Sequence, residues 1–200
     1  MINNDVLRRL RYTFDYSDSA MMKLASTQDK KVTRAEVSAW LKKDDDPTQE
    51  KCIDEQLAIF LNNLIDDKRG KREGPQRPPE KRLTNNLIFM KLKIALNLQA
   101  EDVLEILALA SFKISKHELS AFFRKPGHKH YRECKDQILR NFLQGLQFKF
   151  RPQDVSLKAP KAKNNTKVND DPVSVDPTTD TTIDLTNKDA YKWKKLKPSS

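Results

Sequence analysis

The sequence has few of the residues on which several protein classes depend. Four glycines among 200 residues are too few for a phosphate-binding loop, a dinucleotide fingerprint or a turn-rich β-barrel. Two cysteines are too few for a disulfide-stapled secreted scaffold. No window approaches the roughly 18 consecutive apolar residues of a membrane-spanning helix, and the opening run MINNDVLRRLRY lacks the apolar core of a secretory signal. We therefore expect a soluble, cytoplasmic protein without a membrane partner or a cofactor.

Positive charge is what the chain has in excess, and it is unevenly distributed. The 38 Lys and Arg residues outnumber the 28 Asp and Glu residues, which gives a formal net charge of +10. Residues 1–70 hold 12 basic and 13 acidic residues, whereas residues 85–150 hold 11 basic and 6 acidic residues. The first half is therefore nearly neutral, and an excess of this kind in the second half favours an anionic partner such as DNA or RNA.

The last quarter of the chain differs from the rest in composition. Residues 151–200 contain no Phe, Cys, Met, His or Gly, and they include the polar run NNTKVNDDPVSVDPTTDTTIDLTNKD. Such a segment buries too little apolar surface to offset a chain entropy of about 1–2 kcal/mol per residue. We therefore interpret residues 151–200 as a disordered tail. The folded part is then residues 1–150, which are long enough to bury a sizeable core.

The folded part is a duplication. Shifted by 82 positions, the sequence aligns with itself without a gap, and identical residues meet along the whole span: Asn3-Asn4 with Asn85-Asn86, Cys52 with Cys134, and Phe60-Leu61 with Phe142-Leu143. Chance similarity between helical segments rarely keeps one register over such a length, so we interpret the match as a true repeat. Residues 71–84 contain three prolines and are the connector between module 1 (residues 1–70) and module 2 (residues 85–150).

Each copy has the apolar spacing of four helices. The third helix has the clearest start, because Thr33–Glu36 and Ser115–Glu118 are capping boxes. An Asn-Asn pair precedes the first helix and is expected to cap it, and the duplicated pair can also hold two backbone groups of the other module or contact a ligand. No segment alternates with period two. The sequence thus predicts an all-α fold, a tandem duplication of a four-helix module about an approximate two-fold axis, with Trp40 and Phe122 equally buried.

Two paired runs carry a resemblance to a known family. They are LASTQDKKVTRAEVSAWLKK and LALASFKISKHELSAFFRKPGHKHYRECKDQILRNFLQGL, and each copy is headed by the Asn-Asn pair. The runs resemble the YehS-like proteins, a bacterial family of two such repeats that is labelled as a domain of unknown function. The likeness covers about residues 1–150 and is most specific from Phe123 to Leu139. It implies a cytoplasmic bacterial protein and brings no established activity with it.

The cysteines offer little chemistry. Cys52 and Cys134 are equivalent, and each stands two residues before an Asp, but a nucleophile also needs an oriented base, and no base recurs in both copies. We expect buried structural thiols, no catalytic residues and no enzyme. The spacing of His128, His130 and Cys134 offers three ligands of a zinc type, but a fourth ligand is not evident, so we expect no metal.

The second and third helices of each copy resemble a helix–turn–helix, whose second helix enters the major groove. The connection is about two residues longer than in that motif and lacks its glycine. The expected nucleic-acid-binding residues lie on or just after the third helix: Arg34, Ser38, Lys42 and Lys43 in the first copy, and Lys116, His117, Ser120, Arg124 and Lys125 in the second. Three aspartates, Asp44-Asp45-Asp46, follow the first set in predicted turns, where we expect them to be solvated and to repel phosphate.

The end of the tail is a second candidate for binding. Lysines alternate there with aromatic residues, a combination that suits stacking on bases and neutralising phosphates or docking as a short peptide: Tyr191, Lys192, Trp193, Lys194 and Lys195. Two functions therefore remain open. The sequence favours a non-enzymatic protein that binds DNA or RNA, and the alternative is an adaptor that binds another protein in the groove between the modules.

Overall fold

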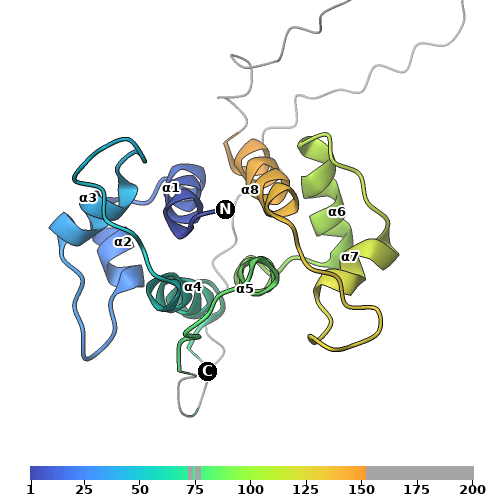
Figure 1. Cartoon of the computed structure of the whole chain (residues 1–200), viewed down its shortest axis with the longest axis horizontal. Coiled ribbons are helices and arrows are strands. Elements are labelled where there is room, and N and C mark those ends of the chain that lie inside the picture. The colour runs from blue at the N-terminus through green and yellow to red at the C-terminus, as the bar shows by residue number, and fades with distance from the viewer. Residues whose placement is uncertain (72–73, 75–77, 152–200) are drawn as a thin grey trace, which may run out of the picture. The chain divides into compact units, whose positions relative to one another are not determined.

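The structure is a computed structural model that describes residues 1–71, 74 and 78–151. These residues form helices and no strand, as the sequence predicts, and none of the helices is long and apolar enough to cross a membrane. The predicted tail lies outside the described residues except for Arg151. The helices, labelled in Figure 1, are α1 (Asn3–Phe14), α2 (Asp18–Ala25), α3 (Arg34–Leu41), α4 (Asp54–Arg69), α5 (Asn85–Ala95), α6 (Ala100–Leu109), α7 (Lys116–Phe122) and α8 (Asp136–Phe150).

The helices of the two copies begin at equivalent positions. Helices α1 and α5 begin at residues 3 and 85, α2 and α6 at 18 and 100, α3 and α7 at 34 and 116, and α4 and α8 at 54 and 136. Every pair is separated by the same 82 residues that relate the two halves of the sequence. The predicted tandem duplication of a four-helix unit is therefore confirmed.

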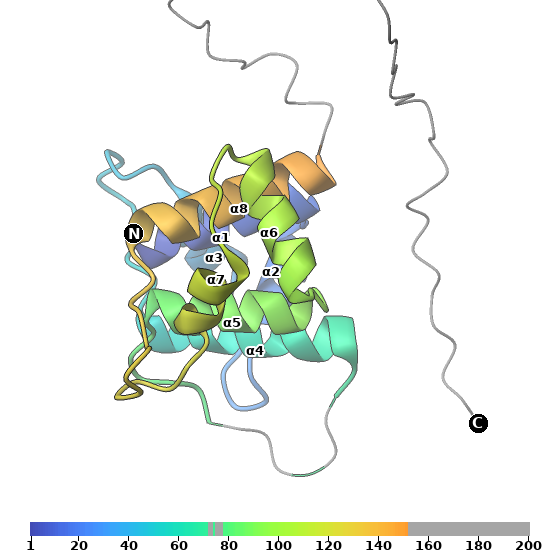
Figure 2. The same ribbon diagram turned by 90° about the vertical axis from the view of Figure 1, so that its right-hand side faces the viewer.

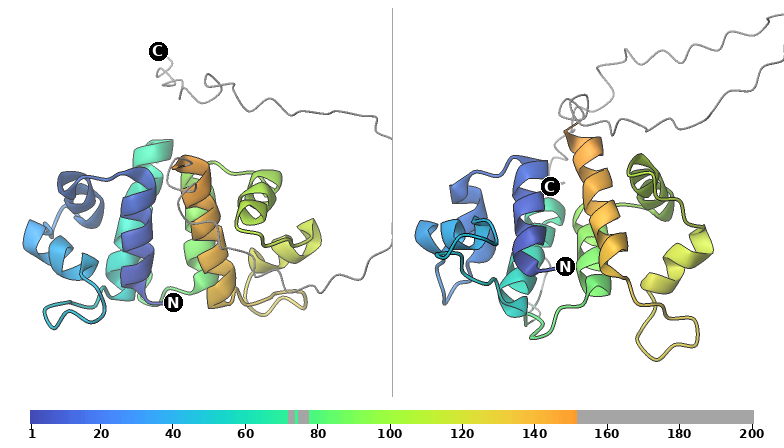
Figure 3. Two further views of the ribbon diagram at one scale, coloured as in Figure 1. Left: turned by 90° about the horizontal axis from the view of Figure 1, so that it is seen from above. Right: turned by 45° about the horizontal axis from the view of Figure 1, so that its top comes forward.

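The four longest helices, α1, α4, α5 and α8, lie in the middle of the folded part (Figure 1). Helix α4 packs against α5 and α1 packs against α8, so both contacts join one copy to the other. Exchanging the copies converts one contact into the other, which is the relation that an approximate two-fold axis produces. The outer pairs α2–α3 and α6–α7 flank this centre on opposite sides, as Figures 2 and 3 show.

Equivalent apolar residues are buried in both copies. Phe60, Leu61, Phe142 and Leu143, the expected core of the fourth helices, are each at most 1% exposed. Trp40 and Phe122 occupy matching places at the outer helix of each copy, with exposed fractions of 8% and 5%. The expectation of like environments for this pair is confirmed. One continuous hydrophobic core runs through both copies.

The helix starts agree with the sequence except at the Asn pairs. Thr33 and Ser115 accept hydrogen bonds from the backbone N–H groups of their capping-box glutamates, and the carboxylates bind back. Asn3 and Asn85, however, are the first residues inside α1 and α5 rather than their caps. The residue at the cap of α5 is Thr84, whose hydroxyl accepts from the backbone N–H of Leu87. The cap assignment of the Asn pairs is therefore wrong, and their side chains serve a different purpose, described below.

The contact between the second and fourth helices is made differently in each copy. In copy one, the Asn63 side chain on α4 donates hydrogen bonds to the carbonyl oxygens of Leu24 and Ser26, at 2.8 and 2.7 Å. The equivalent residue on α8 is Gly145, where the helices come so close that an added Cβ would lie 1.9 Å from the carbonyl oxygen of Ile106, the counterpart of Leu24. Copy two thus replaces a hydrogen-bonded crossing with a close backbone contact.

Substituting alanine at Gly145 is expected to lower the free energy of unfolding by about 2–3 kcal/mol, the upper range for overpacking, because α6 and α8 must separate. The clash outweighs the roughly 1 kcal/mol by which alanine is the better helix residue. Urea denaturation measures the loss. Gln144→Ala, at the exposed neighbouring position on α8, is the control and should change stability little. A Gly145→Ala protein as stable as the wild type would mean that the two helices do not approach as described.

Candidate functional site

In each copy, a buried asparagine on the first helix binds the long loop between the third and fourth helices. In copy one, Asn4 is 1% exposed. Its Nδ2 donates to the carbonyl oxygens of Trp40 and Glu50, at 2.8 and 2.7 Å, and its Oδ1 accepts from the backbone N–H of Cys52 at 3.1 Å. The side chain thereby fastens both ends of the loop to α1.

Asn86 in copy two makes the same three hydrogen bonds. Its Nδ2 donates to the carbonyl oxygens of Phe122 and Arg132, at 2.9 and 2.8 Å, and its Oδ1 accepts from the backbone N–H of Cys134 at 2.9 Å. All hydrogen-bonding groups of this amide are used within its own copy. The expectation that the Asn pair holds backbone groups of the other module, or a ligand, is therefore wrong for Asn4 and Asn86.

The first residues of α4 and α8 add a matching pair of side-chain contacts near the boundary between the copies. Asp54 accepts hydrogen bonds from the backbone N–H of Leu83, in the connector just before copy two, and from the Asn3 side chain of its own copy, and these bonds lower the pKa of its carboxyl group. Asp136 repeats the arrangement with the amino group of Met1 and the Asn85 side chain, which likewise lower its pKa. This pair of matching contacts also obeys the two-fold relation.

The loops held in this way share a backbone arrangement but differ in charge. Residues 42–52, here the acidic loop, contain three basic and four acidic residues, whereas residues 124–134, the basic loop, contain four basic and one acidic residue. In both loops the backbone N–H of the ninth residue, Glu50 or Arg132, donates to the carbonyl oxygen of Ala39 or Ala121. The two loops lie on opposite sides of the central helices in Figure 1.

We expected the aspartates of the acidic loop to be solvated, but two of them accept hydrogen bonds from other residues of the protein. Asp44 accepts from the guanidinium of Arg8 at 2.9 Å, and Asp46 accepts from the backbone N–H of Thr48 at 2.8 Å. Hydrogen bonds from Thr48 lower the pKa of the Asp46 carboxyl group. His128 stands at the equivalent position of the basic loop, and its Nδ1 accepts from the backbone N–H of His130 at 3.1 Å. His128 therefore stabilises the turn of the basic loop in the same way as Asp46 stabilises the turn of the acidic loop.

The expected binding residues of copy two divide into two groups. Lys116 forms an ion pair with Glu101 on α6, and the Ser120 hydroxyl donates to the carbonyl oxygen of His117, so neither is freely presented. His117 itself is exposed, with its ring 6.5 Å from that of His130. Arg124 and Lys125 belong to the basic loop, where Arg124 contacts the His128 ring at 3.4 Å.

Sequence reasoning missed part of this cationic surface. Lys129 and Arg132 are exposed in the basic loop beside Lys125, and the side chains of Lys125 and Lys129 have no hydrogen bond or ion pair with any other described residue. The signal that finds them is the run RKPGHKHYR, which has four Lys or Arg residues and no acidic residue, whereas its counterpart in copy one, KKDDDPTQE, has two Lys and four acidic residues. The helix–turn–helix pattern concerns residues on or just after the third helix, and these loop residues lie farther along the chain.

The matching residues of copy one are more strongly paired. Arg34 lies 3.5 Å from Asp18, and Lys42 contacts Thr48 and lies 3.9 Å from Asp46. Ser38 and Lys43 are exposed. The connections between the second and third helices span residues 26–33 and 110–115, which is longer than the three or four residues of a helix–turn–helix. The excess is about two residues in copy two, as expected, and about four residues in copy one.

The chemistry of the thiols is suppressed. Cys52 and Cys134 are buried, and burial, with a nearby aspartate, raises the pKa of each thiol to about 12. Both thiols are therefore protonated at neutral pH, and a protonated thiol is a poor nucleophile and metal ligand. Cys134 lies in the core while His128 and His130 are exposed, and the described residues bring together no group of three potential metal ligands.

Comparison with known proteins decides the family. The family described as "Protein of unknown function (DUF1456)" matches the chain twice, over residues 3–70 and 85–151, which are the two copies of the duplication. The chain belongs to this family. It is also 40% identical over 147 residues to the "Uncharacterized protein YehS" of Escherichia coli (strain K12), a match that covers 73% of this chain and 94% of that protein. No solved structure matches it.

Family membership covers the clamped loops but not the tail. The family matches end at residue 151, so the candidate tail residues Tyr191–Lys195 lie beyond them and also outside the described residues. The basic loop and the helix that precedes it, by contrast, lie within the second match. In this part of the chain, copy two has the same fold as copy one but a different charge.

Proposed function

We propose that the protein is a non-enzymatic nucleic-acid-binding protein that contacts phosphates through the basic loop and the exposed side of α7. The observation that carries the proposal is the contrast between two loops that have the same asparagine clamp and opposite charge. A fold that needed only the clamp would not require four basic residues on one side and four acidic residues on the other. The difference in charge is therefore best explained by what the loop binds.

The electrostatics of the basic loop suit a phosphate backbone. Lys125 and Lys129 extend into solvent without a carboxylate partner among the described residues, so they can neutralise phosphates without first breaking an ion pair. Arg124 and Arg132 add guanidinium groups on the same loop, and guanidinium binds phosphate with two parallel hydrogen bonds. The acidic loop repels phosphate, which orients the nucleic acid toward copy two.

Replacing Lys125, Lys129 and Arg132 by glutamine is expected to weaken binding and to reduce the salt slope by up to about three phosphate contacts, each worth about 0.9 in the slope. Fluorescence anisotropy with duplex DNA, single-stranded DNA and RNA, from low to moderate salt, measures both quantities. The matched control replaces Arg34, Lys42 and Lys43 of copy one, which removes the same charge. That variant should bind almost as the wild type does.

Three results would contradict the proposal. Equal loss in both triple variants would mean that binding depends on net charge rather than on the basic loop. A wild-type protein that binds none of the three nucleic acids at low salt would favour the protein-adaptor function instead. Loss of binding only when residues 191–197 are deleted would move the site to the tail.

A further inference from the structure

Three histidine rings gather on the outside of copy two. His117 lies on α7, His128 and His130 lie in the basic loop, and all three are exposed. The ring centre of His130 is 5.7 Å from that of His128 and 6.5 Å from that of His117. The counterparts in copy one carry no ring: Ala35, Asp46 and Thr48. Because copy one forms the same fold without them, the rings are not needed for folding.

The backbone of the basic loop fixes the segment that carries two of the rings. The N–H of His128 donates to the carbonyl oxygen of Lys125 at 3.1 Å, and the N–H of Tyr131 donates to the carbonyl oxygen of His128 at 2.7 Å. Between these two turns, the N–H of His130 donates to Nδ1 of His128 at 3.1 Å. This bond uses the edge of the His128 ring.

The end of the same loop is fastened to α7 and α5. The N–H of Arg132 donates to the carbonyl oxygen of Ala121 on α7 at 3.2 Å, and its carbonyl oxygen accepts from Asn86 on α5 at 2.8 Å. The loop therefore returns to the helix that carries His117, which places His130 beside it. A surface arranged in this way before binding loses little freedom when it binds.

The rings alternate with cations that are free to bind. Lys129 stands between His128 and His130 in the sequence, and neither its side chain nor that of Lys125 has a hydrogen bond or ion pair among the described residues. The rings of His117 and His130 likewise have no hydrogen bond or ion pair within that part of the chain. Single-stranded nucleic acids are bound by cations that follow the backbone and by rings on which the bases stack. Histidine is one of the side chains that stack in this way.

Helix α7 is poorly suited to the alternative, a base-paired duplex. Its Lys116 is paired with Glu101, and its Ser120 hydroxyl is bonded to the carbonyl oxygen of His117, so two of the expected reading side chains are occupied. In a duplex the bases are stacked on one another and present only their edges in the grooves. Exposed rings therefore find base faces to contact only where the bases are unpaired.

We propose that the basic loop binds single-stranded nucleic acid, with unpaired bases stacked on the rings of His117 and His130 and phosphates on the cations of the loop. This inference rests on the proposed function and narrows its ligand to unpaired strands. Every base has a face on which to stack, so the site should accept strands of different sequence.

Fluorescence anisotropy of the full chain with three probes tests the role of the bases. The probes are a thymidine dodecamer, the same strand with abasic residues in its interior, and the duplex with an adenosine dodecamer. At about 0.15 M salt, the thymidine strand should bind about tenfold or more tightly than the abasic strand, which keeps the phosphates but offers no base faces. It should also bind more tightly than the duplex. Titration at pH 8 limits the contribution of imidazolium, because histidine changes its charge between about pH 5 and 8.

A pair of double variants separates stacking from charge. Replacing His117 and His130 by alanine should weaken binding of the thymidine strand about tenfold and leave binding of the abasic strand unchanged. Replacing both by phenylalanine is the matched control, which keeps the rings without imidazole nitrogens and should restore binding. His128 is left in place because its ring stabilises the turn. Circular dichroism and thermal melts establish that each variant is folded.

Three results would overturn the inference. They are equal binding of the thymidine and abasic strands, a duplex that binds as tightly as the single strand, and a phenylalanine variant that loses as much affinity as the alanine variant. If the triple variant of Lys125, Lys129 and Arg132 still loses binding in these cases, the basic loop binds phosphates without stacking, and the proposed function stands alone. A wild type that binds none of the probes, even at low salt, contradicts both.

Discussion

Replacing Asn86 by alanine is expected to lower the free energy of unfolding by about 3 kcal/mol or more, because three buried or half-buried backbone groups lose their partner and each costs about 1–3 kcal/mol when left unsatisfied. The groups are the carbonyl oxygens of Phe122 and Arg132 and the N–H of Cys134. They are the two ends of the basic loop, so the variant should also bind nucleic acid less tightly. Urea denaturation and anisotropy measure the two effects.

Asn4→Ala in copy one is the matched control. It removes the same three hydrogen bonds from the acidic loop and should destabilise the protein to a similar extent, but it should leave nucleic-acid binding unchanged in the folded protein. Equal binding by both variants would mean that the clamp does not shape a binding surface. A stable Asn86→Ala protein would contradict the clamp itself.

An isosteric variant separates hydrogen bonding from packing. In Asn86→Asp, the Oδ1 acceptor for Cys134 remains, but a second oxygen faces the two carbonyl oxygens to which the amide donated. The protonated acid can donate there and the carboxylate cannot, so folding raises the pKa of the introduced group. A raised pKa in the folded state gives stability that is present in acid and is lost as the pH rises. The variant should therefore be less impaired near pH 4 than at pH 7, relative to the wild type.

The fold was predictable from the sequence because its main signals are local or repeated. The capping boxes at Thr33 and Ser115 depend on residues three positions apart, and the offset of 82 residues needs only the sequence laid on itself. Burial of Trp40 and Phe122 follows from helical spacing in two copies that share one pattern. None of these inferences requires knowledge of which helices pack together.

The asparagine clamp could not be predicted, since its partners are distant in the chain. Asn4 lies 36 residues from Trp40 and 48 residues from Cys52, and its partners are backbone groups, which leave no trace in residue identity. The same applies to the Asp54 contact with the backbone of Leu83. Repetition of the Asn-Asn pair showed that the residues mattered, but capping was the nearest local explanation.

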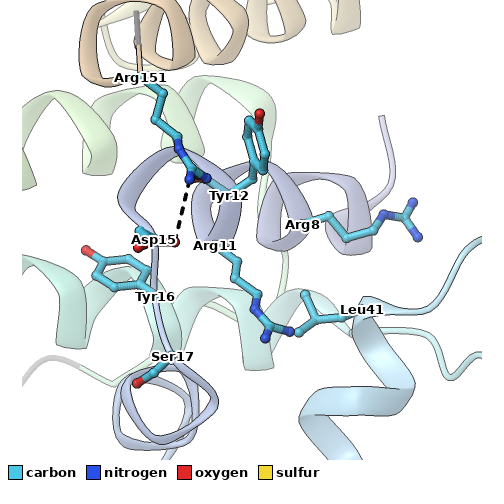
Figure 4. A pocket seen from close by; sticks show the side chains of 8 residues that line it. All are labelled: Arg8, Arg11, Tyr12, Asp15, Tyr16, Ser17, Leu41 and Arg151. Carbon is cyan, nitrogen blue, oxygen red and sulfur yellow. Dashed lines mark hydrogen bonds and ion pairs between the residues drawn. The ribbon is translucent and has the colours of Figure 1, made fainter. Parts of the chain in front are cut away.

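The candidate site was predicted in part for a related reason. Arg124 and Lys125 are identified from charge near a helix end, but the pairing of Lys116 with Glu101 joins separate helices and is invisible in the sequence. The pocket of about 510 Å³ along α1, drawn in Figure 4, was missed altogether. Arg8 and Arg11 share a helical face in the sequence, yet Arg151 reaches Tyr12 from the end of α8, a contact between residues 139 positions apart.

Phe142→Ala is expected to lower the free energy of unfolding by about 3–5 kcal/mol, the usual cost of truncating a buried phenylalanine. Phe142 is fully buried, and its ring centre lies 4.3 Å from that of Phe89, an aromatic contact worth about 0.5–1.5 kcal/mol beyond burial. Phe60→Ala, at the equivalent position, should lie at the lower end of that range because its neighbour in place of Phe89 is Leu7. Domains are stable by only about 5–15 kcal/mol, so both variants should melt at clearly lower denaturant concentrations. An unchanged midpoint for Phe142→Ala would mean that α8 presents another face to the core.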